Sequence, residues 1–87
     1  MELHNYMEDI VEGILEKILA EREDVCKCEK CKLDIMALAL NRLPPKYVVT
    51  QKGRIYTKLS ELELQLRADV TKEVTKAIEK VKNNPQH

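Results

Sequence analysis

Residues 26–50 read CKCEKCKLDIMALALNRLPPKYVVT, and this stretch decides both the fold and the candidate site. Three cysteines within six residues lead into an apolar run, 35–40, that leaves no polar face over nearly two helical turns. Pro44 and Pro45 end this helix, because proline disfavours helical geometry at the residue before it. We therefore predict a cysteine-bearing loop at 23–33, followed by a buried helix at about 35–43 with Asp34 as its N-cap.

The cysteines themselves form a metal-ligand pattern. Thiolates at short fixed offsets can converge on one tetrahedral ion, and Cys28 and Cys31 have the two-residue gap of a zinc knuckle. Lysines at 27, 30 and 32 would offset the negative charge of a thiolate-rich site. We predict a Zn²⁺ site with Cys26, Cys28 and Cys31 as ligands. A redox-active pair and three unbound thiols are the alternatives, because a second CxxC is missing.

A closed structural zinc site needs a fourth ligand, which the sequence leaves open. Asp34 lies one turn beyond Cys31 but suits the N-cap equally well. His4 and His87 are the imidazoles of the chain, and each could simply be solvated. The cluster has no adjacent histidine, and the chain has no glycine-rich phosphate loop. We therefore expect that the protein is not an enzyme.

Amphipathic helices are predicted on both sides of this stretch. Apolar residues recur at helical spacing from Leu3 to Leu19, which indicates a helix at about 3–22, with Asn5 and Glu8 as a capping box near its start. Gly13 inside it marks either a close backbone approach or a neutral surface position. Ser60 begins a second capping box, so a helix at about 61–83 should follow. Its apolar stripe comprises Leu66, Val70, Val74, Ala77, Ile78 and Val81.

Two β-rich runs, 47–50 and 54–57, are separated by residues 51–53 and predict a hairpin at about 47–57. Cations and aromatic rings cluster around it, and such a surface can hold phosphates and stack a base. The tentative nucleotide site comprises Arg42, Lys46, Tyr47, Arg54 and Tyr56, with Lys58 nearby. Ordinary hairpin surface residues are the alternative. Lys72, Lys76 and Lys80 form a row on the last helix that we interpret as a solvated face.

Composition sets the remaining bounds. The 87 residues form one domain without Phe or Trp, and 15 basic residues balance 15 acidic ones. A net charge of zero argues against direct nucleic-acid binding, and no apolar run is long enough for membrane insertion. The N-terminal residues do not resemble a signal peptide, so we expect a cytoplasmic protein with reduced thiols. The wide apolar stripes exceed what one small domain can cover, which predicts a symmetric homodimer.

The chain resembles the late-competence ComFB family in its cysteine cluster, in DI at 34–35, in ALALNRLPP at 37–45 and in YVVT at 47–50. The resemblance implies a small, mainly α, zinc-binding homodimer of the bacterial cytosol, with Cys26, Cys28 and Cys31 as ligands. It also implies a link to DNA uptake and natural transformation and, in some members, to cyclic-dinucleotide binding. No late cysteine is available here as a fourth ligand. We expect a single ComFB-like domain, 1–87, that acts as a non-enzymatic regulatory or adaptor protein with an unknown protein partner. The alternative is a receptor for c-di-GMP or c-di-AMP.

Overall fold

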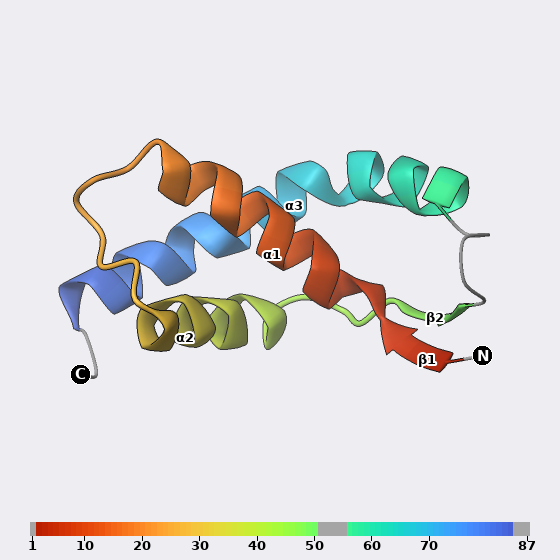
Figure 1. Cartoon of the computed structure of the whole chain (residues 1–87), viewed down its shortest axis with the longest axis horizontal. Coiled ribbons are helices and arrows are strands. Elements are labelled where there is room, and N and C mark those ends of the chain that lie inside the picture. The colour runs from red at the N-terminus through yellow and green to blue at the C-terminus, as the bar shows by residue number, and fades with distance from the viewer. Residues whose placement is uncertain (1, 51–55, 85–87) are drawn as a thin grey trace.

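The computed structural model describes residues 2–50 and 56–84, with side chains from 2–49 and 63–84. Its elements follow the order β1 (Glu2–Asn5), α1 (Tyr6–Ala20), α2 (Glu29–Leu40), β2 (Tyr47–Thr50) and α3 (Tyr56–Asn83). The mainly helical fold is confirmed, with a two-stranded antiparallel sheet beside the helices. Figure 1 shows this sheet at one end of the molecule and the loop that precedes α2 at the other.

The start of α1 is fixed by Asn5. Its Oδ1 atom accepts hydrogen bonds from the backbone N–H of Met7 at 3.2 Å and of Lys46 at 2.9 Å, so it caps α1 and holds the segment leading into β2. The expected start at Leu3 is wrong, because Leu3 lies in β1 and its backbone belongs to a strand ladder. The expected end at about 22 is also late, since α1 ends at Ala20.

The strand β2 pairs with β1 in antiparallel register, from Glu2↔Thr50 to Asn5↔Tyr47. The predicted hairpin between 47–50 and 54–57 is therefore wrong, because β2 has a partner far away in sequence and Tyr56 begins α3. Residues 51–55 lie outside the described residues. The expected helix at about 61–83 begins at Tyr56 instead, five residues earlier, and ends at Asn83.

The helix α2 begins at Glu29 and not at about 35, and Cys28 takes the N-cap position that we assigned to Asp34. The expected loop at 23–33 is accordingly shorter, and Cys31 belongs to the first turn of the helix. The carboxylate of Asp34 accepts hydrogen bonds from Lys30 at 2.7 Å, one turn earlier on the same helix. The helix ends at Leu40, ahead of the two prolines.

The core lies where the three helices meet. The helix α1 contributes the stripe that its sequence predicts, and α3 contributes Val70, Val74, Ala77, Ile78 and Val81. Burial of α2 is narrower than expected: within the run 35–40, Ile35 and Ala39 are buried, whereas Ala37 is exposed. Cys31 is buried as well, and Leu33 is 55% exposed. Gly13 is exposed, and nothing lies within 4 Å of the position a Cβ would take, which fits the surface alternative. None of the helices in the described ranges is long and apolar enough to cross a membrane.

Candidate metal centre

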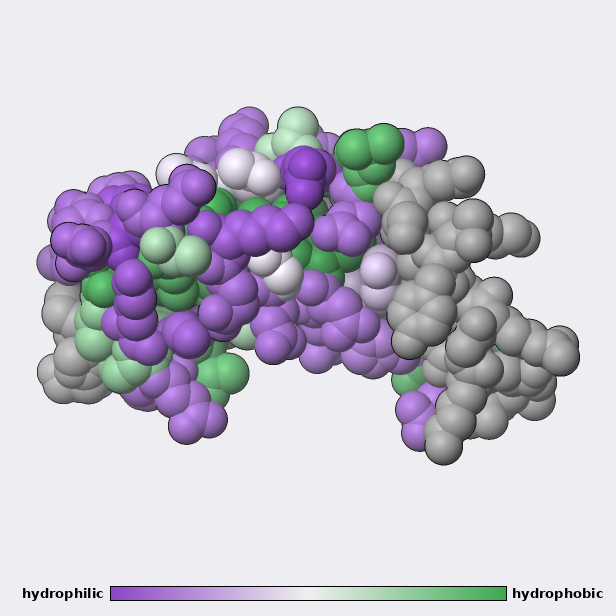
Figure 2. Space-filling model, turned by 45° about the horizontal axis from the view of Figure 1, so that its top comes forward, coloured by the Kyte–Doolittle hydropathy of each residue, from purple (hydrophilic) through white to green (hydrophobic). Residues whose placement is uncertain are grey.

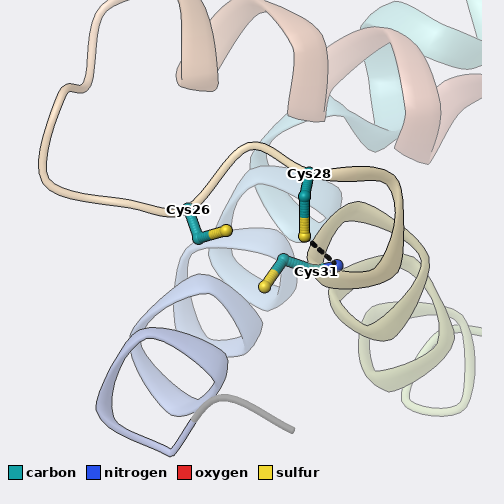
Figure 3. Close-up of side chains that lie close together, drawn as sticks. All are labelled: Cys26, Cys28 and Cys31. Atoms are coloured by element: carbon teal, nitrogen blue, oxygen red, sulfur yellow. Dashed lines mark hydrogen bonds between the residues drawn. The ribbon is translucent and has the colours of Figure 1, made fainter. Parts of the chain in front are cut away.

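The three cysteine sulfurs converge at the start of α2. Cys26 comes from the preceding loop, Cys28 is the N-cap and Cys31 stands in the first turn, so the last two face the same side. All three Sγ atoms lie within 4.8 Å of one another. Figure 3 shows them directed toward a common space. The structure thus brings together the full set of thiols that the sequence predicts as metal ligands.

The environment of these thiols differs from one to the next. The Sγ of Cys28 accepts a hydrogen bond from the backbone N–H of Cys31 at 3.5 Å, and this bond, followed by a contact from Cys26, lowers the pKa of Cys28. Cys31 is 1% exposed, and burial raises the pKa of its thiol to about 12, with the neighbouring thiols adding to the effect. These two shifts favour the thiolate at Cys28 and the protonated thiol at Cys31. A bound cation would favour the thiolate at all three positions.

A network of charged side chains holds the loop that precedes Cys26. Arg22 binds Asp24 at 2.6 Å and Glu79 at 2.9 Å, and Lys82 binds Asp24 at 2.7 Å. The hydrogen bond from Arg22, followed by that from Lys82, holds the pKa of Asp24 well below its usual range. Val25 is buried directly after this pair. The loop is thereby attached to the last turns of α3, which fixes the position from which Cys26 reaches the other thiols.

The predicted candidates for a fourth ligand are placed elsewhere or engaged. The His4 ring binds Asp9 at 2.8 Å, at the sheet end of the molecule, away from the thiols (Figure 1). The carboxylate of Asp34 is paired with Lys30, and His87 lies outside the described residues. In the part of the chain that the structure covers, the cluster with metal-ligating geometry consists of the three cysteines alone. These three cysteines are therefore the described residues that could hold a metal ion together.

The tentative nucleotide site is only partly described. Lys46 and Tyr47 are adjacent at the start of β2, with Lys46 half-buried and Tyr47 63% exposed. Arg42 is exposed just beyond the C-cap of α2 and lines a cleft against α3. Tyr56 is the first residue of α3, and Arg54 lies outside the described residues. This nucleotide site stays a prediction. This cleft between Arg42 and α3 was not predicted from the sequence. The lysines at 72, 76 and 80 indicate a charged face on α3, but their spacing does not show that the end of α2 packs beside that face.

The fold and the site define the class as a small, mainly helical domain with three thiols at a helix N-terminus that could hold a metal ion. Residues 4–85 match the family model described as "Late competence development protein ComFB". The chain therefore belongs to the ComFB family, and the resemblance seen in the sequence is confirmed.

A curated sequence and a solved structure, both of ComFB from Bacillus subtilis, illustrate the match. The "Competence protein ComFB" of strain 168 is 32% identical over 63 residues, which span 72% of this chain and 64% of that relative's length, slightly less than two thirds. The structure reported as a structural characterization of the late competence protein ComFB from Bacillus subtilis has a TM-score of 0.79 and 26% identity to this chain. That similarity covers 98% of this chain and 93% of the other.

Proposed function

We propose that the protein is a non-enzymatic, zinc-binding, dimeric regulatory or adaptor protein of the bacterial cytoplasm, linked to DNA uptake and natural transformation. Membership of the ComFB family supports the link to competence. The observation that carries the metal proposal is the convergence of three thiols within 4.8 Å.

Zinc suits this donor set better than a hard cation, because thiolates are soft ligands and Zn²⁺ accepts them in tetrahedral geometry. A Zn–S bond of about 2.3 Å places tetrahedral sulfurs about 3.8 Å apart. The sulfurs of Cys26, Cys28 and Cys31 already lie within 4.8 Å, so a closure of about 1 Å completes that part of the shell. The metal would link the loop to the first turn of α2 and so stabilise the fold. Chemistry on a substrate is not required of it.

Cobalt provides a direct test of the three ligands. Titration of metal-free protein with Co²⁺ should give the sulfur-to-cobalt charge-transfer absorption of a thiolate-rich tetrahedral site. Serine at 26, 28 or 31 should weaken that absorption, whereas serine at the exposed, non-ligating Leu33 should leave it intact. A cobalt spectrum without sulfur bands would remove the thiols from the metal site.

Dimerisation is supported by apolar side chains at the sheet end. Leu3 and Val49 are cross-strand partners on one face of the sheet and are 72% and 56% exposed. Tyr47, on the same strand face, is 63% exposed. A two-stranded sheet is marginally stable by itself, and its edges offer unpaired backbone groups. A second copy that covers this face would bury these side chains.

Sedimentation of matched variants tests this interface. The wild type should sediment at twice the chain mass at micromolar concentration, and Val49→Glu should shift it toward monomer. Leu33→Glu, at a similarly exposed position on α2 (55% against 56%), should remain dimeric. A wild type that sediments at the mass of one chain would contradict the proposal, and so would equal dissociation in both variants.

The second candidate function is a cyclic-dinucleotide receptor. The favouring observation is Tyr47, an exposed ring next to Lys46 on the face proposed to meet a second copy. A two-fold symmetric ligand between two copies could stack on both rings, and cations nearby could bind its phosphates. Calorimetry with c-di-GMP and c-di-AMP should then show saturable binding that Tyr47→Ala weakens. The absence of heat with either ligand at millimolar concentration would leave the adaptor function alone.

A further inference from the structure

The two cysteines at the start of α2 differ in their access to solvent. Cys28 is exposed at the N-cap, whereas Cys31, three residues later in the first turn, is 1% exposed. Residues three apart lie on the same side of a helix, so these two thiols are neighbours (Figure 3). A dissolved reagent can therefore reach Cys28 directly, while the core shields Cys31.

The surroundings of Cys28 favour reaction at its sulfur. Its Sγ accepts the backbone N–H of Cys31 at 3.5 Å, at the end of α2 where free N–H groups attract negative charge. Thiols at helix N-termini and in Cys-x-x-Cys segments are more reactive nucleophiles than ordinary cysteines, and residues 28–31 combine both features. Cys26 is exposed too, but it belongs to the loop before α2. Cys28 is therefore the thiol best placed to attack an oxidant.

The start of α2 also suits a bond between the sulfurs of Cys28 and Cys31. In regular helical geometry, Cα atoms three residues apart are separated by about 5 Å, within the range of about 4.4–6.8 Å that a disulfide spans. The two Sγ atoms already lie within 4.8 Å of each other. Rotation of the two side chains can close that distance without unwinding the helix.

We propose that Cys28 is a site of reversible oxidation by hydroperoxides, with Cys31 as the thiol that completes a disulfide. With hydrogen peroxide, the Cys28 sulfur attacks one oxygen: an S–O bond forms, the O–O bond breaks, and the departing hydroxide leaves as water with the thiol proton. The Cys31 sulfur then attacks the sulfenic acid: the S–S bond forms, the S–O bond breaks, and a second water leaves with the Cys31 proton. The two thiols lose two electrons in total, and the peroxide gains them.

This modification goes beyond the proposed function, because it requires the reduced thiols and not the zinc. It would nevertheless compete with zinc, since the disulfide consumes two of the three proposed ligands. Oxidation should therefore release bound zinc and uncouple Cys26 from the first turn of α2. A dithiol reductant should restore both thiols by disulfide exchange.

Peptide mapping of the full chain tests the site. The reduced wild type, treated with a slight excess of hydrogen peroxide and then alkylated, should contain a disulfide between Cys28 and Cys31 and an alkylated Cys26. Treatment with a dithiol reductant before alkylation should leave all three cysteines alkylated. Cys26→Ser should form the same disulfide, whereas Cys28→Ser should lose it. A disulfide that includes Cys26, a disulfide between two chains, or full alkylation after peroxide in the wild type would overturn the proposal.

A double variant, Cys26→Ser with Cys31→Ala, isolates the first step. Alanine is chosen at 31 because it places no hydroxyl in the core. Cys28 should remain a sulfenic acid in this variant and react with dimedone, whereas Cys26→Ser alone, which keeps Cys31, should lose most of that label. Absence of label in the double variant would overturn the reactivity of Cys28, and equal labelling of the two proteins would overturn the role of Cys31.

Metal content before and after peroxide separates this proposal from the zinc proposal. Zinc-loaded wild type should release its metal as the disulfide forms. A protein that binds no zinc but forms this disulfide supports the oxidation site and refutes the zinc site. A zinc-binding protein whose thiols resist peroxide even after chelation refutes the oxidation site and leaves the zinc proposal standing.

Discussion

Serine in place of Cys28 should separate the two roles that the structure gives this residue. Cys28 is the N-cap of α2, with its Sγ accepting the N–H of Cys31, and it is also one of the three converging thiols. A serine hydroxyl is a preferred N-cap group, but it is a poor ligand for zinc. Cys28→Ser should therefore keep the cap and remove one of the three proposed metal ligands.

The expected effect on stability follows from this separation. A metal at a free concentration of 100 to 1,000 times its Kd stabilises the folded state by about 2.7 to 4.1 kcal/mol. In a domain of this size each kcal/mol moves Tm by about 4–8 °C, so loss of the metal should lower Tm by at least about 11 °C. With a chelator present, Cys28→Ser should equal the wild type or exceed it by up to about 1 kcal/mol, because the cap is retained.

Thermal melts followed by circular dichroism, with zinc and with chelator, measure both quantities. Cys26→Ser is the matched control: Cys26 is exposed and outside the helix, so this variant should lose the zinc-dependent increment alone. Cys31→Ser should be destabilised in both conditions, since it places a hydroxyl in the core at a cost of about 1–3 kcal/mol. The reasoning is refuted if Cys28→Ser keeps the zinc-dependent rise in Tm. It is also refuted if the Tm of Cys28→Ser falls below that of the wild type by the same amount with chelator as with zinc.

Three further predictions concern the fold around the site. Gly13→Ala should raise stability to urea by about 0.5–1 kcal/mol, because Gly13 is exposed inside α1 with free space around it; a decrease would mean that this face packs against another surface. Because the folded-state pKa of Asp24 is depressed, the stability that its ion pairs contribute is present above about pH 4 and is lost as the pH falls through that folded-state pKa. Asp24→Asn should therefore flatten the decline of the urea midpoint below about pH 4. An unchanged decline in this variant would exclude the Asp24 network as its cause. Ile35→Ala, at a fully buried position of α2, should cost about 2–5 kcal/mol in urea unfolding, and a wild-type midpoint would contradict the packing of α2 in the core.

The helical stripes could be predicted because they depend on local spacing. The stripe from Met7 to Leu19 and the one from Val70 to Val81 are buried as their sequences indicate. The start of α1 could not be predicted in this way, because Leu3 continues the helical spacing and yet pairs with Val49. Pairing between distant strands is set by tertiary structure. The sequence rules for hairpins consider only strands that are close in the chain, so they paired 47–50 with 54–57 and not with β1.

The proximity of the three thiols was predictable, but the structure around them was not. The spacing of Cys26, Cys28 and Cys31 indicates convergent thiols, and the structure brings their sulfurs together. The capping role of Cys28 was missed because Asp34 is the stronger N-cap by residue type. The attachment of Asp24 to Lys82 was equally hidden, since the two residues are 58 positions apart. Figure 2 shows apolar patches between hydrophilic side chains on one face of the molecule.

The metal content of the protein, purified without added metal, tests the central claim most directly. Elemental analysis of wild type and of Cys26→Ser, Cys28→Ser and Cys31→Ser should be combined with a thiol count after chelation, so that oxidised samples are recognised. The account predicts about one zinc per chain in the wild type and a marked loss in each variant. A fully reduced wild type that contains no zinc, takes up none on addition of the metal and is as stable with chelator as without would contradict it.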